Sequence, residues 1–463
     1  MPASALEAIP PYAGVCLPED TRRPGLSTAE ASLRLRRLAF TKQRLALLAA
    51  AHLNARPEWE VKAALALHGW YDAEHATLLR RRVLELRITP AQLEEVPAEP
   101  LVAVLEEALR ARTTIELLTG VYAVLRPAML EAVERYLAGT NLLADHPSCR
   151  LLRWIATEER EASEWGRAAL AAVTTSPEAQ QESAEWAKHL RAYMAAAGGL
   201  DGTQVVPAIE LPPPRAAEPF AAEVLPRRDE RFSGLFDTST PSDVVYLDDA
   251  RPAAERNLAL YFKRLREMDV PEVIAGILAQ TPGKPWDYYA DLARQMWDEA
   301  RHALLGQAEL EARGVDWTAL PVNVTFSYKL GKFCSPIERH ILLYAIEQSL
   351  MPARRGKRYE WMIARKARDP LSTTFQDFDW ADEVLHVAIA RRQLRGDLKG
   401  GLEEARRRSD ALWERIAAEL EREPLPADSA PPDWWARFVE SVLGRRPESV
   451  PETHVKDWRP LSA

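Results

Sequence analysis

The sequence contains little that favours β-structure or a covalent framework. Runs that alternate apolar and polar residues with β-branched or aromatic side chains are almost absent, which excludes a fold built on sheets. Cysteine is also scarce. Cys16, Cys149 and Cys334 are an odd number of widely spaced residues without a Cys-x-x-Cys pair, which argues against both a disulfide framework and a zinc site. A reducing, cytoplasmic location is therefore expected.

Excess basic charge and long apolar runs are missing as well. The formal net charge is −8 and the pI is near 5.8, so the chain has no basic footprint and nucleic acid is not an expected partner. No run of about 18 apolar residues occurs, and no basic stretch followed by an apolar core stands at the N-terminus. We therefore expect a protein that is neither exported nor held in a membrane.

What the chain has in abundance is helical sequence. Alanine, leucine, glutamate and arginine recur at helical spacing through most of two long stretches, which predicts an all-α protein. Proline, glycine and serine interrupt the pattern between these stretches and mark a linker. The Pro-rich, Trp-containing end is expected to be an arm packed on the body. The expected segments are an N-terminal arm at 1–26, a helical bundle at 27–197, a linker at 198–249, a second bundle at 250–423 and a C-terminal arm at 424–463.

The motif Glu-x-x-His occurs twice in this helical sequence, at Glu299 and His302 and at Glu383 and His386. Residues three apart lie on one helix face, so each pair projects together. A single such pair is usually a solvated surface. Histidine is scarce here, however, with nine in 463 residues, and both pairs lie in amphipathic runs. Two pairs, with one carboxylate from each of two other helices, form the ligand set of a dimetal-carboxylate site in a four-helix bundle.

Glu347 is the expected carboxylate from the helix between the two motifs. That helix is predicted to start at Ser335 and Pro336, with serine as the cap. Glu347 lies on the apolar stripe of this helix, where an unpaired carboxylate would cost several kcal/mol unless a metal or a cation compensated it. Glu338 and Glu360 are fallbacks, since surface charge explains them better.

The carboxylate of the first helix is less clearly specified. An antiparallel pairing with the helix of Glu299 places Glu267 at the right level, whereas helical phase favours Asp269 and Glu272. Pro271 can kink or restart the helix, which would disturb the phase. We take Glu267 as the expected ligand and Glu272 and Asp269 as the alternatives.

Two aspartates directly precede the ligand glutamates. Asp298 and Asp382 are candidates for orienting the imidazoles by hydrogen bonding. They point about 100° away from the ligand glutamate on a helix. A capping role, or a surface ion pair with Arg301, is therefore an equally good reading of both.

An internal repeat relates the two halves. Residues 70–79 resemble residues 297–306, which sets Asp72 and His75 over Glu299 and His302. Further along, an offset of 225 residues sets Pro127 over Pro352, Tyr122 over Glu347, and Glu158 and Glu161 over Glu383 and His386, with Glu159 as the alternative to Glu158. Because tyrosine replaces a carboxylate, the N-terminal bundle is expected to lack metal and to serve packing, dimerisation or substrate access.

The order carboxylate, Glu-x-x-His, carboxylate, Glu-x-x-His resembles the ferritin-like superfamily of di-iron and di-manganese carboxylate proteins. The resemblance covers residues 250–395, and residues 27–190 as a degenerate copy. It implies two tandem ferritin-like four-helix bundles and two iron ions, or a Mn/Fe or Mn/Mn pair instead. The implied ligands are Glu299, His302, Glu347, Glu383 and His386. The chain departs from the simplest family pattern because its first helix has no unambiguous carboxylate ligand.

The function implied by the resemblance is a non-haem dimetal oxidase or oxygenase that activates dioxygen to oxidise a small organic substrate. An electron donor and a homodimer are compatible with this reading. The alternative is a non-catalytic scaffold or protein-interaction module in which metals only staple the bundle. Fold analogy does not choose the reaction.

Overall fold

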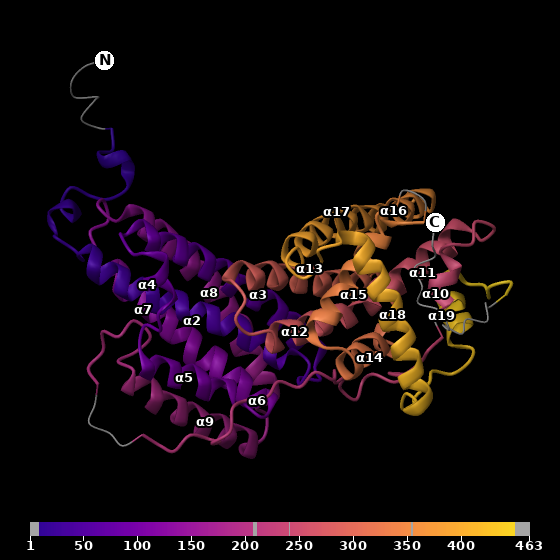
Figure 1. The fold of residues 1–463 in the computed structure, drawn as a ribbon, viewed down its shortest axis with the longest axis horizontal. Helices are drawn as coiled ribbons and strands as arrows, with labels where there is room; N and C mark the ends of the chain where they lie inside the picture. The colour runs from indigo at the N-terminus through magenta and orange to yellow at the C-terminus, as the bar shows by residue number, and fades with distance from the viewer. Residues whose placement is uncertain (1–8, 207–210, 240, 353–354, 450–463) are drawn as a thin grey trace. The chain divides into compact units, whose positions relative to one another are not determined.

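The protein is helical throughout the part that the structure describes. The computed structural model describes residues 9–206, 211–239, 241–352 and 355–449, and every regular element in these residues is a helix (Figure 1). The prediction of an all-α protein is confirmed. Within these residues, no helix combines the length and apolarity needed to span a bilayer. All three cysteines are free thiols.

The chain divides into two compact units, which differ from the expected segments: the expected linker 198–249 is shared between the units, and one N-terminal segment changes unit. The segment 49–70 belongs with the second half of the chain. Trp59 shows why, because its buried ring packs on Trp317 and Phe232 at centroid distances of 5.1 and 5.9 Å. Helical periodicity does not reveal such a long-range contact. Unit 1 comprises Met1–Leu48 and Tyr71–Ala221, and unit 2 comprises Ala49–Trp70 and Ala222–Ala463.

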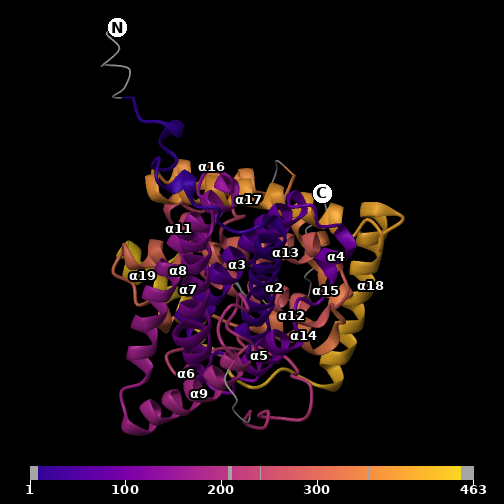
Figure 2. The ribbon, with the colours of Figure 1, turned by 90° about the vertical axis from the view of Figure 1, so that its left-hand side faces the viewer.

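Unit 1 is an assembly of long helices. Helices α7 and α8 pack side by side (Figure 2), and a π-helical segment, η3, leads directly into α7. The elements are α2 (Thr28–Leu53) and α3 (Trp59–Glu85), which both continue into unit 2, then α4 (Pro90–Glu94), α5 (Glu99–Leu109), α6 (Thr114–Leu118), η3 (Thr119–Leu125), α7 (Arg126–Gly139), α8 (His146–Val173) and α9 (Pro177–Ala196).

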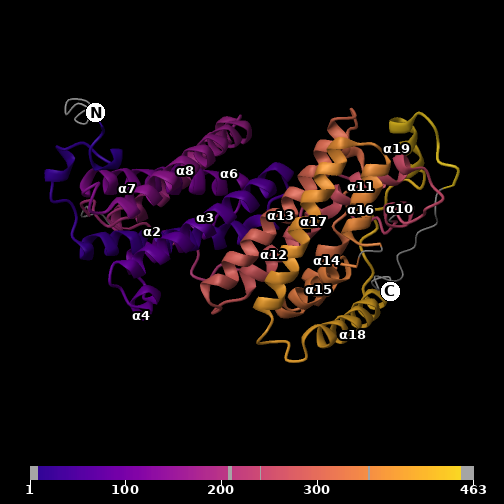
Figure 3. The same ribbon diagram turned by 90° about the horizontal axis from the view of Figure 1, so that it is seen from above.

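Unit 2 is built around α13. This helix packs against α11, α12 and α17, and α15 packs against α12, α17 and α18 (Figure 3). The elements are α10 (Pro241–Val245), α11 (Ala253–Leu265), η4 (Arg266–Met268), α12 (Asp269–Gln280), α13 (Trp286–Glu311), η5 (Trp317–Ala319), α14 (Thr325–Phe333), α15 (Pro336–Ser349), α16 (Lys357–Lys366), α17 (Pro370–Gln393), α18 (Gly401–Arg422) and α19 (Trp434–Leu443).

Local sequence sets the ends of the helices that carry the motifs. Helix α15 starts where expected, with Ser335 and Glu338 in a reciprocal capping box and Pro336 in the first turn. At the start of α17, Asp369 accepts a hydrogen bond of 3.0 Å from the Ser372 amide. Helix α13 is followed by Gly314, whose φ of 69° suits the reversal of the chain there.

The first helix of unit 2 is interrupted between α11 and α12. Residues 266–268 form one 3₁₀ turn, and Pro271 lies in the first turn of α12. A 3₁₀ turn advances by about 120° per residue rather than 100°, so three residues shift the helical phase by roughly 60°. The interruption therefore turns Glu267 toward a different side of the helix from Asp269 and Glu272.

The expected C-terminal arm contains a helix that completes the core of unit 2. Trp434, Trp435 and Phe438 of α19 pack around Phe262 of α11, with the Trp434 and Phe262 ring centroids 4.7 Å apart. Burial of these rings anchors the arm to the unit. The remainder of the expected arm, 450–463, lies outside the described residues.

Candidate metal centre

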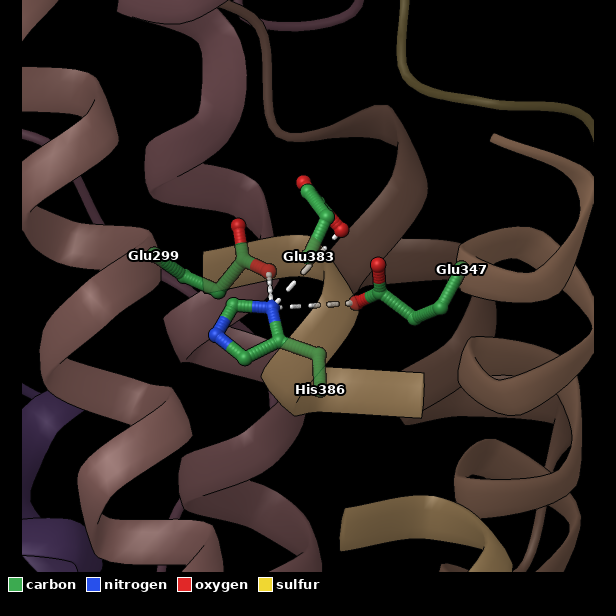
Figure 4. A group of neighbouring side chains, drawn as sticks. All are labelled: Glu299, Glu347, Glu383 and His386. Carbon is green, nitrogen blue, oxygen red and sulfur yellow. Dashed lines mark ion pairs between the residues drawn. The ribbon is translucent and has the colours of Figure 1, made fainter. Parts of the chain in front are cut away.

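Three helices of unit 2 direct acidic and histidine side chains toward one buried point. Glu299 from α13, Glu347 from α15, and Glu383 and His386 from α17 each offer one ligand atom, and these atoms lie within 4.8 Å of one another (Figure 4). None of the four residues is more than 3% exposed. Metal ions such as zinc bind carboxylate oxygen and imidazole nitrogen at about 2.0–2.2 Å. Opposite ligands of one ion then lie roughly 4 Å apart, so the group has the size of a single-ion site.

A second group adjoins the first. Glu267, Glu299 and His302 form one set with the same spacing, and His302, Asp379 and Glu383 form another. Glu299 and Glu383 therefore belong both to the group of His386 and to that of His302. The two imidazole centroids are 6.0 Å apart. The arrangement provides two neighbouring cation positions that share two carboxylates.

Each imidazole faces an aspartate from the other motif helix. Nε2 of His302 forms a hydrogen bond of 3.0 Å with Oδ2 of Asp382, and Nε2 of His386 lies 3.5 Å from Oδ2 of Asp298 without a hydrogen bond. The aspartate beside each ligand glutamate thus faces the histidine across the helix pair, and Arg301 pairs with both aspartates. The Nδ1 atoms are left to face the acidic cluster.

The Nδ1 atoms point at carboxylates without making hydrogen bonds. That of His386 lies 3.1 Å from Glu299, 3.8 Å from Glu347 and 3.7 Å from Glu383. That of His302 lies 3.4 Å from Glu299. Buried polar atoms without a hydrogen-bond partner gather at this point: Nδ1 of His302 and of His386, Oε2 of Glu347 and of Glu383, and Oδ2 of Asp379. Buried donors and acceptors are normally satisfied, so a cation fits here.

The charges of the cluster also favour a bound cation. Five carboxylates converge, those of Glu267, Glu299, Glu347, Asp379 and Glu383. Among the described residues, Lys357 and Arg264 are the lysine and arginine side chains that pair with them. Negative charge is therefore in excess, in a region where four of the five carboxylates are buried and the Glu267 side chain is 15% exposed. Such an excess is unfavourable unless protons or metal ions compensate it.

The pKa shifts of the cluster residues reflect this excess of negative charge. Burial and the charge of Glu383 hold the pKa of Glu347 well above its usual range. Burial also raises the pKa of Glu267 to about 7, although Arg264 and Lys357 oppose the shift. Burial alone would lower the pKa of His302, but Asp379 and the hydrogen bond to Asp382 raise it to about 10. The cluster attracts positive charge.

Three residues of this cluster were not expected from the sequence. Asp379 lies one helical turn before Glu383 on the same face of α17, and that spacing was a signal that could have identified it. Lys357, at the start of α16, and Arg264, in α11, carry no comparable local signal. Their place beside the carboxylates follows from helix packing alone.

Of the first-helix carboxylates, the structure brings Glu267 to the cluster. Its Oε2 lies 3.7 Å from Nδ1 of His302. Asp269 and Glu272 lie elsewhere, where both accept hydrogen bonds from Ser327, and Glu272 also pairs with Lys62 at 2.9 Å. These two alternatives are therefore engaged by other partners.

The two fallback carboxylates, Glu338 on α15 and Glu360 on α16, also have other partners, and the expectation that Glu360 is surface charge was wrong because this residue is buried. Glu338 belongs to the cap of α15 and pairs with Arg415 at 3.0 Å. Glu360 is buried and pairs with Lys263 and with Arg264, the latter at 2.6 Å. Glu347, in contrast, lies in the cluster and accepts a hydrogen bond of 3.1 Å from Gln295.

Unit 1 contains a matching cluster with a different charge balance. Lys42 donates to Asp72 at 2.6 Å and also to Glu159. Arg126 donates to the same two carboxylates, at 2.8 Å each. His75 lies within the same group of potential ligands. Two carboxylates thus meet two fixed cations, and the protein itself neutralises the cluster.

Lys42, on α2, contacts Asp72 and Glu159, which the predicted repeat sets over Glu299 and, in the alternative register, Glu383. Glu159, the alternative register on α8, is buried in the cluster, whereas Glu158 contacts His75 at 2.5 Å from its edge and Glu161 is exposed. Tyr122 is buried beneath Arg126. Tyr122 therefore stands where the repeat sets Glu347, and two cations join the cluster of unit 1.

The chain matches no protein-family model, no curated protein and no solved structure.

Proposed function

We propose that unit 2 is a ferritin-like four-helix bundle that holds a dinuclear metal centre, with iron in both positions. It acts as an oxidase or oxygenase that uses dioxygen to oxidise a small organic substrate. One observation carries the proposal: each Nδ1 faces several carboxylates without a hydrogen bond, while each Nε2 faces an aspartate of the other motif helix. Metal-ligating histidines are oriented by carboxylates in this way.

The proposed ligands are Glu299, Glu347, Glu383 and His386 for one position, and Glu267, Glu299, Glu383 and His302 for the other. Glu299 and Glu383 belong to both groups and would be shared between the two ions. Carboxylate-rich sets with one imidazole per ion suit iron and manganese better than copper or zinc. The Mn/Fe and Mn/Mn pairs therefore remain alternatives to the di-iron centre.

When bound, such a metal pair supplies two electrons for the reduction of dioxygen. The residues of this chain provide the setting for that chemistry. Asp298 and Asp382 fix the imidazoles, and Arg301 fixes both aspartates. The neighbouring Gln295 orients Glu347 through its amide. Burial of the ligands excludes bulk water, which strengthens these interactions.

The experiment that tests the proposal is elemental analysis of protein produced with iron and manganese available, followed by optical spectroscopy. We expect up to two metal ions per chain at saturation, and a charge-transfer band that appears only after exposure of the reduced protein to oxygen. A folded protein that contains no transition metal under either supply would contradict the proposal.

A metal-stapled scaffold is the second candidate, and two observations favour it. The residues of the cluster are almost completely buried. A cavity of about 670 Å³ lies in unit 1, and the residues that line it, among them Glu116, Trp186 and Arg215, do not belong to the cluster. Two bound metals that never change oxidation state in the presence of oxygen would support the scaffold over the oxidase.

A further inference from the structure

The two cation positions of the centre differ in their surroundings. Nζ of Lys357 lies 2.7 Å from Glu383, 2.9 Å from Asp379 and 3.8 Å from Glu267. The side chain of this lysine is fully buried. All three carboxylates belong to the groups that surround His302. The ammonium therefore binds the carboxylates that a metal ion beside His302 would need.

The position beside His386 has no comparable cation. Among the described residues, no lysine or arginine pairs with Glu299 or Glu347, and Glu383 is the one member of this group that Lys357 reaches. Arg264 adds to the asymmetry because it contacts Glu267 and Asp379, again on the side of His302. Fixed positive charge is thus concentrated at one of the two positions.

Unit 1 contains a cluster whose carboxylates pair with a buried lysine and a buried arginine. Lys42 and Arg126 neutralise Asp72 and Glu159, the residues that the repeat sets over Glu299 and, in the alternative register, Glu383. Lys357 neutralises one half of the unit 2 cluster in the same way. The position beside His386 is therefore open to a metal ion, whereas the Lys357 ammonium occupies carboxylates of the position beside His302.

We infer that Lys357 competes with the second metal ion, so that the two positions fill at different affinities. This inference rests on the proposed function and adds an order of loading to it. The position of His386 binds first. The position of His302 fills only when an ion displaces the Lys357 ammonium from Glu383 and Asp379, because two cations that close together repel each other strongly in a buried site. The asymmetry also allows two different metals to occupy the centre.

The test is anaerobic titration of the full chain with Mn(II), with bound metal measured by calorimetry and pair formation measured by electron paramagnetic resonance. In the wild type we expect one tight site and a second site at least tenfold weaker. In Lys357→Met the second site should approach the first, and the signal of a coupled Mn pair should appear at lower Mn(II) concentration. Lys357→Gln provides a second neutral side chain if the methionine variant folds poorly.

Lys263→Met is the matched control. Lys263 pairs with Glu360 and does not reach the cluster, so its loss should leave both affinities unchanged. Equal affinities at both positions in the wild type would overturn the inference while leaving the proposed function intact. Unequal affinities that persist unchanged in both Lys357 variants would also overturn it. If the folded wild type and both variants bind no Mn(II) or iron, the proposed function fails as well.

Discussion

Oδ2 of Asp382 lies 3.0 Å from Nε2 of His302, although the two residues belong to different helices. Asp298 faces His386 in the reciprocal way, at 3.5 Å. Each Asp-Glu-x-x-His segment therefore supplies a ligand pair from its own helix and an orienting carboxylate for the histidine of the other. The surroundings of each ligand histidine therefore depend on the segment that carries the other.

Removal of an orienting aspartate should weaken metal binding without abolishing it. We expect Asp298→Asn and Asp382→Asn each to lower metal affinity by about 10–100-fold, the usual effect of losing such a partner. Competition with a chelator of known affinity measures this. Asp377→Asn, at an exposed position on α17, is the control and should have no effect. Unchanged affinity in both aspartate variants would reject the orienting role.

Substitution of the proposed ligands in unit 2 should change the amount of bound metal, whereas substitution of their counterparts in unit 1 should not. Glu299→Ala or His386→Ala should remove bound metal, because each deletes a ligand of the open position. Asp72→Ala or His75→Ala should not, since fixed cations already neutralise the unit 1 cluster. Elemental analysis of the four purified variants distinguishes the units. Equal metal loss from both pairs would show that the assignment is wrong.

The cluster of unit 1 should contribute to the free energy of unfolding rather than to metal binding. Lys42→Met leaves Asp72 and Glu159 with one cation, and loss of one partner from a buried ion pair costs about 3–5 kcal/mol. Chemical denaturation should show a decrease of this order in the free energy of unfolding. Lys42→Met combined with Glu159→Gln should recover part of it. A single variant as stable as the wild type would contradict this account.

Close packing of α13 on α11 should be essential for placing Glu267. A Cβ atom on Gly306 would lie 2.3 Å from the backbone nitrogen of Leu265. Gly306→Ala should therefore lower stability by about 1–3 kcal/mol and weaken metal binding, since α11 must move and Glu267 lies just beyond it. Gly396→Ala, where a Cβ meets nothing within 4 Å, is the control for thermal unfolding and metal titration.

Glu309 should make stability depend on pH. Burial and the charge of Asp369 raise its pKa to about 8, although the Ser372 hydroxyl and the charges of Arg313 and Arg264 oppose the shift. The folded protein therefore keeps a proton that the unfolded chain loses above its ordinary pKa of 4.5. This contribution to stability falls as pH rises from about 4.5 to 8.

Replacement of this carboxyl by an uncharged amide should remove the pH dependence. Glu309→Gln should raise the melting temperature relative to the wild type, by a margin that is small at pH 5 and grows toward pH 8. Glu403→Gln, at an exposed position on α18, should produce no such trend in the same thermal scans. A difference in melting temperature that stays constant across this pH range would exclude Glu309 as the source of the pH dependence.

The sequence by itself determined the all-α fold, the ends of several helices and the pairing of residues within each motif. Ser335 and Pro336 begin α15 because capping involves atoms only three residues apart. Glu299 and His302 share a face because the helical repeat places them together whatever surrounds the helix. Glu347 could be singled out because a carboxylate on an apolar stripe needs a partner.

The tertiary structure alone decided which side chains meet across helices. A 3₁₀ turn selected Glu267 over Asp269 and Glu272, and Lys357 reached the cluster from a helix that carries no motif. The segment 49–70 joined unit 2 through the packing of Trp59. Local hydrogen bonding fixes the period of a helix, but its rotation and its neighbours follow from burial of apolar surface between segments that are distant in the chain.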